Sequence, residues 1–300
     1  MNARQDATQD RPLRLPSPIV EVFDPVPTDA QIRLFLKRDD LIDPEIPGNK
    51  WRKLRHNLEA AQRVGAGTLL TFGGAYSNHI RATARAGADH GFETIGVIRG
   101  ESHLPLNPVL QSAFDSGMQI TYMDRATYRE KMSAPVIDSL HRKFGDFYLL
   151  PEGGSNTEAV HGCAELPEEM SADQVGDSYI FTCAVGTGGT LAGVAAGLPR
   201  KARAIGFAVL KGGDFLTDDV RRLQTAAGYH TENWHIETDY SFGGYAKRRL
   251  ELDEFIEVFR QRHGITLDWV YEAKMMLGLF RMIQAGRFRP GTTLVALIAA

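Results

Sequence analysis

Short apolar segments alternate with longer amphipathic segments along most of the chain. Runs of four to six largely apolar residues, such as 68–72, 179–184 and 294–298, have the character of buried strands. Between these runs, apolar positions recur every three or four residues, as in 271–285, which predicts helices. The alternation is typical of an α/β fold, in which helices cover both faces of a mainly parallel sheet.

The predicted elements can be given by residue number. Strands are expected at 32–37, 68–72, 94–99, 118–123, 147–150, 179–184, 204–209 and 294–298. Helices are expected at 51–64, 77–90, 107–116, 128–143, 157–165, 190–197, 250–263 and 271–285, and Pro135 should break or kink the fourth of these.

A glycine-rich turn, Gly186-Thr187-Gly188-Gly189-Thr190, follows a predicted strand and opens a helix. Glycines let the backbone N–H groups turn toward an anion, and the helix N-terminus adds positive potential. The turn lacks the Gly-Lys-Ser/Thr ending of a P-loop and the glycine spacing of a dinucleotide fingerprint. It therefore predicts a site for one phosphate group, although a tight strand–helix turn without a ligand would have the same pattern.

A second loop, Gly73 to His79, also follows a predicted strand. Ser77 and the N–H groups after it could bind a substrate carboxylate, and the Asn78 amide suits a hydroxyl or phenolate oxygen. Ser77 could equally be an ordinary helix N-cap. His79 fits either a site residue or a residue on the helix face.

Lys50 lies at the start of the predicted helix whose apolar positions are Trp51, Leu54, Leu58 and Ala61. A lysine that is partly desolvated and close to other cations has a lowered pKa, and its neutral amine can form a Schiff base. The alternative is a solvated lysine at a helix N-terminus, which is where most lysines lie.

Three later residues are further candidates for the site: Tyr245, Tyr271 and Glu272. Each also has a structural interpretation, as a packing residue or as an acid in the first turn of a helix. Asp39, Asp40 and Asp43 lack the spacing of metal ligands and are expected in a solvated loop. Cys163 and Cys183 are expected to be structural.

Composition and charge exclude several classes of protein. The 300-residue chain has a net charge of −3 and is 43% apolar, so neither a nucleic-acid-binding nor a membrane-surface protein is expected. Two cysteines, a polar N-terminus and the lack of a long apolar run favour a cytoplasmic protein without a secretory signal. The first dozen residues are expected to form a loose arm.

These motifs together indicate pyridoxal 5′-phosphate (PLP), and in this combination the chain resembles the 1-aminocyclopropane-1-carboxylate (ACC) deaminase/D-cysteine desulfhydrase family. The resemblance rests on Gly48-Asn49-Lys50, the Gly73–His79 loop, Pro151-Glu152-Gly153-Gly154-Ser155-Asn156 and the Gly186–Thr190 turn. It implies a fold type II PLP enzyme with two domains, each with a mainly parallel sheet flanked by helices. Residues 1–51 and 152–300 would form the large PLP-binding domain, and residues 52–151 a smaller mobile domain.

The resemblance also implies roles for individual residues. Lys50 would form the Schiff base and move protons, Asn78 would bond the pyridoxal 3′-oxygen, and Ser77 would sit at the substrate carboxylate. The Gly186–Thr190 turn would hold the phosphate. Tyr245 and Tyr271 match two active-site tyrosines, and Glu272 matches an acid that faces the pyridine nitrogen. Relatives are usually homodimers.

Two departures bear on the choice between the two activities. Glu272 favours the deaminase, whereas His79, which stands where deaminases typically have glutamine, favours the desulfhydrase. Relatives usually continue past the last strand with His-Thr-Gly-Gly or His-Leu-Gly-Gly, whereas this chain ends at Ile298-Ala299-Ala300. That difference has three interpretations: a shortened chain, a divergent site or weaker cofactor binding.

The resulting hypothesis is a PLP-dependent lyase or deaminase that forms a 2-oxo acid and ammonia from a small amino acid through a Lys50 Schiff base. Two alternatives stay open. One is another PLP reaction on the same fold, such as racemisation or serine/threonine dehydration. The other is a non-catalytic protein that keeps the fold and binds a ligand.

Overall fold

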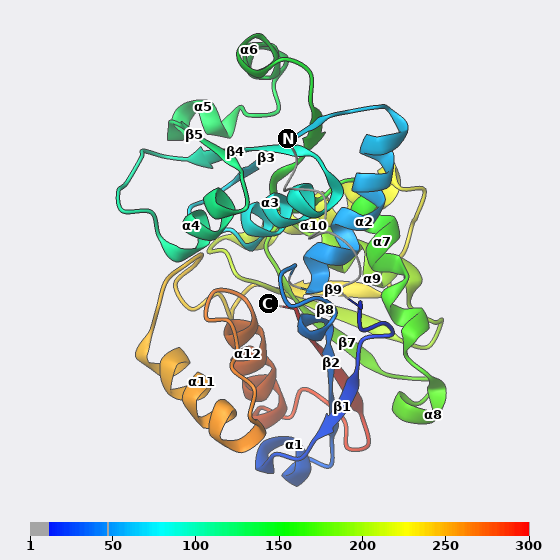
Figure 1. Ribbon diagram of the computed structural model, residues 1–300. Coiled ribbons are helices and arrows are strands. Elements are labelled where there is room, and N and C mark those ends of the chain that lie inside the picture. The colour runs from blue at the N-terminus through cyan, green and yellow to red at the C-terminus, as the bar shows by residue number, and fades with distance from the viewer. Residues whose placement is uncertain (1–11, 47, 300) are drawn as a thin grey trace.

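The computed structural model describes residues 12–46 and 48–299, and the chain forms two sheets (Figure 1). Most of the predicted N-terminal arm lies outside the described residues, as do Pro47 and Ala300. Among the residues that the structure describes, no helix has the length and apolar character needed to cross a membrane.

The larger sheet has six strands in the order β1-β2-β10-β7-β8-β9. All neighbouring pairs are parallel except β1 and β2, which are antiparallel. The strands are β1 (Ile19–Val22), β2 (Arg33–Arg38), β7 (Ile180–Val185), β8 (Arg203–Ala208), β9 (Trp234–Glu237) and β10 (Thr293–Ile298).

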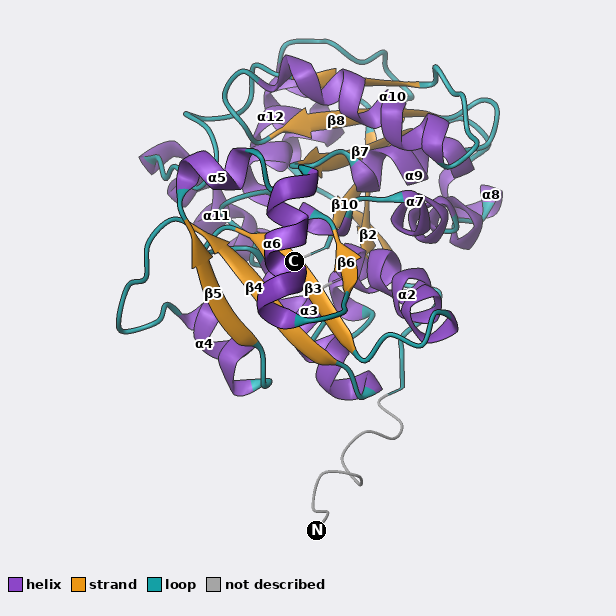
Figure 2. Cartoon of the chain, turned by 90° about the horizontal axis from the view of Figure 1, so that it is seen from above, coloured by secondary structure: helices purple, strands orange, loops and turns teal. Residues whose placement is uncertain are grey.

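The smaller sheet has four parallel strands in the order β5-β4-β3-β6, and Figure 2 shows it with α6 in front. The strands are β3 (Thr68–Gly73), β4 (Glu93–Arg99), β5 (Gln119–Met123) and β6 (Tyr148–Leu150). Both sheets thus confirm the α/β prediction. The predicted boundary between residues 51 and 52 falls inside one continuous helix, α2 (Gly48–Arg63).

Eleven further α-helices surround the sheets in the described part of the chain. They are α1 (Pro25–Asp29), α3 (Asn78–His90), α4 (Pro108–Asp115), α5 (Arg125–Arg129), α6 (Ala134–Phe144), α7 (Thr157–Ala164), α8 (Ala172–Val175), α9 (Gly189–Gly197), α10 (Leu216–Ala226), α11 (Leu250–His263) and α12 (Glu272–Gln284). The predicted helix over 128–143 is divided, with Pro135 in the first turn of α6, so the predicted break is confirmed.

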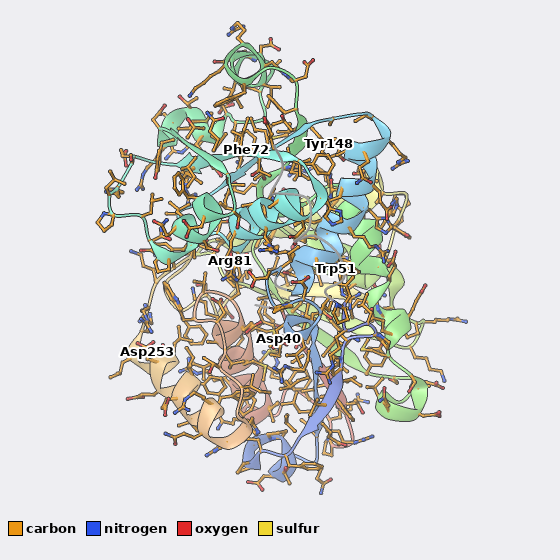
Figure 3. All side chains as sticks on the ribbon, viewed as in Figure 1. Asp40, Trp51, Phe72, Arg81, Tyr148 and Asp253 are labelled. Carbon is orange, nitrogen blue, oxygen red and sulfur yellow. The ribbon has the colours of Figure 1, made fainter. Side chains whose placement is uncertain are left out.

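Close packing of α2, α7 and α9 brings together the helix that carries Lys50 and the helix that follows the Gly186–Thr190 turn. A Cβ atom on Gly162 of α7 would lie 2.1 Å from the Arg52 carbonyl oxygen of α2, and one on Gly197 of α9 would lie 1.9 Å from the Ala164 carbonyl oxygen. Glycine is therefore required for α7 to approach both neighbours. The apolar face of α2 is buried as expected, and Trp51 and Tyr148, labelled in Figure 3, pack at the edge of its cluster.

The prediction of a solvated loop at residues 39–43 is wrong. Asp39 is fully buried in a short 3₁₀ turn, η1 (Asp39–Leu41), and Asp43 is also buried. The reason is a buried partner: both Asp39 carboxylate oxygens accept hydrogen bonds from the Arg52 guanidinium, at 2.7 and 2.9 Å. Asp40 is half-buried and pairs with Arg38.

Arg52 is the centre of a buried network of charges. It also donates to both carboxylate oxygens of Glu169, at 2.8 and 2.9 Å, and Lys37 approaches the same carboxylate at 2.6 Å. Burial alone would raise the pKa of Glu169, but the hydrogen bonds and charges of Arg52 and Lys37 lower it to about 2. The network joins β2, η1, α2 and the 3₁₀ turn η3 (Leu166–Glu169), and so fixes the helix that carries Lys50.

Candidate active site

A cavity of about 410 Å³ lies where the carboxyl ends of strands from both sheets meet. This is the expected position of a binding site in parallel α/β sheets. Its wall includes all but one of the residues predicted from the sequence: Lys50, Ser77, Asn78, Gly186, Thr187, Gly188, Thr190, Tyr245, Tyr271 and Glu272. The exception, Gly189, begins helix α9 directly behind the wall.

Lys50 lies in the first turn of α2 and is half-buried in this wall. Burial, and then the positive charge of Lys53 one turn further along, lower its pKa to about 7. A large fraction of the amine is therefore uncharged at neutral pH. An uncharged lysine amine is the form that attacks an aldehyde, so the structure supports a nucleophile at this position.

The glycine-rich turn faces a set of hydrogen-bond donors. Gly188 has a positive φ of 83°, which lets the chain turn tightly into the N-terminus of α9. The hydroxyls of Ser155 and Thr187 are 2.6 Å apart, and the Lys53 ammonium donates to Ser155 and to the Gly153 carbonyl, each at 3.2 Å. Backbone N–H groups, two hydroxyls and one ammonium together suit a single phosphate group.

Ser77 is buried and caps helix α3, accepting a hydrogen bond from the Ile80 N–H at 3.4 Å. Both interpretations of Ser77 therefore fit, because the same side chain caps the helix and lines the cavity. Asn78 follows it and is half-buried in the cavity wall. The N-terminus of α3 thus opens toward the cavity as a second place for an anion.

His79 is buried and also lines the cavity. Its Nε2 lies 2.8 Å from the Thr71 hydroxyl, which itself donates to the Leu150 carbonyl, so the hydrogen-bond pattern assigns the proton to Nε2. Burial and the charges of Lys50 and Lys53 hold its pKa well below the usual value, so the ring is neutral. Its Nδ1 has no hydrogen-bond partner among the described residues.

Two tyrosines meet on another part of the wall. The hydroxyls of Tyr245 and Tyr271 are 3.5 Å apart, and the rings pack edge to face. Burial raises the pKa of both phenols, so both keep their protons at neutral pH. Lys274, a fully buried residue of α12, donates to the Gly244 carbonyl and so holds the loop that carries Tyr245.

Glu272 is the first residue of α12 and is 2% exposed. Its two carboxylate oxygens accept hydrogen bonds from the backbone N–H groups of Asp268 and Ala299. These contacts fix the carboxylate in the cavity wall next to the end of β10. The structural interpretation, an acid in a helix first turn, and the functional one are therefore both compatible with its position.

The sequence interpretation missed several residues of the cavity wall, chiefly Lys53, Arg99, Lys131 and Glu152. Lys53 could have been found, because a residue three positions after Lys50 lies on the same helix face. Arg99 ends a predicted strand, where binding residues gather in this fold class. Nothing in the local sequence marks Lys131.

Comparison with known proteins decides the family. The family model described as "Pyridoxal-phosphate dependent enzyme" matches residues 12–299, which is nearly the whole chain. The chain belongs to the PLP-dependent enzyme family. The resemblance noted from the motifs is thereby confirmed, and PLP is the cofactor.

Named relatives of this PLP enzyme fall into two groups. A putative ACC deaminase of Pyrococcus furiosus is 31% identical over 264 residues, covering 84% of this chain and 80% of the relative. D-cysteine desulfhydrase of Klebsiella pneumoniae is 30% identical over 276 residues, covering 85% and 83%. The crystal structure of an ACC deaminase homologue superimposes with a TM-score of 0.82 at 28% identity, covering 95% of this chain and 89% of that one.

The residues present fit PLP. A Cβ atom on Gly189 would lie 2.5 Å from the Ser155 hydroxyl and 3.1 Å from the Lys53 ammonium, so only glycine leaves room for the donors to converge. The phosphate-type donor set and the reactive lysine share one cavity. PLP carries one phosphate and one aldehyde, which are the two groups that these residues can bind.

The pKa of Lys50 predicts how the PLP-free enzyme captures an aldehyde. Below pH 7 the amine is protonated and unreactive, so the capture rate should rise with pH through about 7 and level off above it. Lys53→Met should move this midpoint to higher pH, because it removes a neighbouring positive charge. Stopped-flow absorbance with pyridoxal, which has no phosphate for Lys53 to bind, measures the rate. An identical midpoint in both proteins would contradict the assigned cause.

Gly189→Ala tests the donor set directly. The added methyl group would crowd Ser155 and Lys53, and overpacking of this kind costs about 1–3 kcal/mol. We therefore expect the affinity for PLP to fall about tenfold. Gly67→Ala is the matched control, since a Cβ atom at Gly67 meets nothing within 4 Å. Titration of the apoenzymes with PLP measures both, and an unchanged dissociation constant in Gly189→Ala would show that the turn does not hold the phosphate.

Proposed function

We propose that this enzyme converts a small amino acid into a 2-oxo acid and ammonia, as a D-cysteine desulfhydrase or an ACC deaminase does. One observation carries the proposal: Lys50, with a pKa near 7, shares a cavity with the phosphate-type donors of the Gly186–Thr190 turn. The names of the relatives supply the two candidate substrates.

Six groups of this chain would hold the cofactor. Lys50 would bond covalently to the aldehyde, and the turn with Ser155 and Lys53 would hold the phosphate. Asn78 would donate to the 3′-oxygen, and Glu272 would face the ring nitrogen. When bound, PLP withdraws electrons from the α-carbon of the substrate and so stabilises negative charge there.

The remaining steps are proton transfers by residues of the chain. The Lys50 amine would take or return a proton at the α- or β-carbon of the substrate, since its pKa lies near neutrality. The α3 N-terminus with Ser77 would bind the substrate carboxylate. Tyr245 and Tyr271 stay protonated and can donate to the reacting group.

The two candidate reactions differ in the bond that breaks. D-cysteine and water would give pyruvate, hydrogen sulfide and ammonia, through loss of the α-proton and cleavage of the carbon–sulfur bond. ACC has no α-proton, so its ring opens at the ring carbons, and ACC and water would give 2-oxobutanoate and ammonia. Glu272 favours the second reaction and His79 the first, so the residues alone leave both.

A substrate panel tests the proposal. The holoenzyme is mixed with D-cysteine, ACC and the two enantiomers of serine, and oxo acid, sulfide and ammonia are measured. Equal amounts of oxo acid and ammonia from D-cysteine or ACC would support the proposal, whereas these products from serine alone would indicate a dehydratase. Loss of chirality without oxo acid would indicate a racemase, and no change in any compound would contradict the proposed reaction.

We also propose that the enzyme is a homodimer in the cytoplasm. Three exposed apolar side chains, Tyr76, Leu104 and Phe114, are carried by α4 and by the loops that precede α3 and α4, and a hydrogen bond from Asn107 to the Ala75 carbonyl joins these two loops. Apolar side chains that gather on a surface are typical of interfaces. The two cysteines are free and buried, which suits a reducing compartment. Sedimentation equilibrium would measure the oligomeric state.

A further inference from the structure

Three charged side chains line the cavity on the side of the four-stranded sheet. Arg99 is the last residue of β4, and Lys131 follows α5. Glu152 begins the 3₁₀ turn η2 (Glu152–Gly154), which Pro151 separates from β6. The charges of Arg99 and Glu152 both act on the phenol of Tyr245. Tyr245 lies in the segment between β9 and α11 and lines the same cavity. A substrate at Lys50 would therefore share its cavity with this cluster.

A buried tyrosine holds the two cations of the cluster. The guanidinium carbon of Arg99 lies 5.8 Å from the ring centroid of Tyr128, and the Lys131 ammonium lies 4.7 Å from it. Both distances allow a cation–π contact. Because Tyr128 is only 2% exposed, the ring is a rigid support that keeps both cations at the cavity.

The charges in this cluster are not balanced. Lys131 is neutralised by Glu152, whose carboxylate lies 3.1 Å from the ammonium. The Arg99 guanidinium makes no hydrogen bond or ion pair with any residue in 12–46 or 48–299, and the side-chain contact that it makes there is with the Tyr128 ring. One guanidinium, with its planar fork of N–H donors, is thus left for a ligand, and that fork matches carboxylate, sulfonate and phosphate groups.

Arg99 and the α3 N-terminus lie at different depths. Ser77 is 9% exposed, whereas Arg99 is exposed to solvent. The Arg99 Nη2 atom approaches the chain at Gly74, 3.8 Å from the position of a Cβ atom there, and Gly74 is three residues before Ser77. The cavity thus offers a deep place for one anion and an outer place for another.

We propose that Arg99 binds a second anionic group, carried on the side chain of the substrate. The enzyme then acts on amino acids whose side chain bears a carboxylate, a sulfonate or a phosphate ester. This inference rests on the proposed function and narrows its substrate.

Isosteric pairs of amino acids test the proposal, because aspartate and asparagine, or glutamate and glutamine, differ in charge but hardly in shape. Each compound, in both enantiomers, is titrated into the holoenzyme, and binding is followed by the cofactor absorbance and by calorimetry. The wild type should bind the acid about tenfold more tightly than the amide. Arg99→Met should remove this preference and leave the amide affinity unchanged, and Arg99→Lys should keep part of it.

Arg125→Met is the matched control, because Arg125 is an exposed arginine of the same region that does not line the cavity. It should keep the preference for the acid. A wild type without that preference would overturn the proposal. So would an Arg99→Met variant that weakens acid and amide equally, since Arg99 would then serve the α-carboxylate. The cofactor band reports the proposed function separately: its absence contradicts that function, whereas a band with equal affinities contradicts the assignment of Arg99 alone.

Discussion

Lys50→Ala should reduce turnover by a factor on the order of 10³ or more. The substitution removes the amine that would bond the cofactor aldehyde and the group that would move protons on the substrate. The absorbance band of the lysine-bound cofactor, at about 420 nm, should disappear as well. Cofactor should still bind, because the phosphate donors of the Gly186–Thr190 turn, Ser155 and Lys53 are unchanged.

The control for this variant is Lys201→Met. Lys201 is an exposed lysine that pairs with Asp177 and does not line the cavity, so its loss should change neither the band nor turnover. Circular dichroism and gel filtration show whether Lys50→Ala is folded. A folded Lys50→Ala protein that keeps both the band and its turnover would disprove the assignment of Lys50.

Arg52→Met should have the largest effect on stability. The substitution leaves Asp39 and Glu169 in the interior without the guanidinium that donates four hydrogen bonds to them. Removing one partner of a buried ion pair costs about 3–5 kcal/mol, because the remaining charge is buried and unpaired. That charge is Asp39, since Glu169 keeps its ion pair with Lys37. Urea unfolding should show a loss of this size in the free energy of unfolding.

Arg33→Met provides the comparison, because Arg33 pairs with Glu21 through a similar two-point contact at the surface. An exposed pair contributes about 0–1 kcal/mol, since water solvates the Glu21 carboxylate that remains after the change. If the two variants lost equal stability, the buried network would not be what fixes α2.

The elements of the fold that follow a regular pattern could be predicted from the sequence. Helix α11 was predicted at its observed bounds, and the strands around β3 and β7 within one or two residues. Their apolar residues repeat at the period of the element and point into a core, so local sequence carries the signal. Strand β9 was missed because it is a short edge strand with the polar residues His235 and Glu237.

Helix α10 was missed although its sequence carries a signal. Leu216, Val220 and Leu223 are spaced by four and three residues and pack on the core beside β8. No element was predicted between residues 209 and 250, a segment that contains several glycines and acids. The spacing of the apolar residues was therefore sufficient to predict α10.

The site could be predicted only where a motif lies in one stretch of sequence. Lys50, the Ser77 loop and the Gly186–Thr190 turn each precede or begin a helix, so their chemistry is visible locally. The partners of Arg52 could not be found in this way, because Glu169 lies 117 residues away in the sequence. Asp39 was placed in solvent for the same reason, since its burial depends on that distant partner.

The most direct test of the central claim is to locate the cofactor on the chain. The holoenzyme is reduced with borohydride, digested, and the peptides are analysed by mass spectrometry. Four lysines of the described residues have a lowered pKa, namely Lys37, Lys50, Lys53 and Lys274, and each could in principle react with an aldehyde. We expect the pyridoxyl group on Lys50 alone. A pyridoxyl group on one of the other three lysines, or on no lysine of a holoenzyme that binds PLP, would contradict this account of the active site.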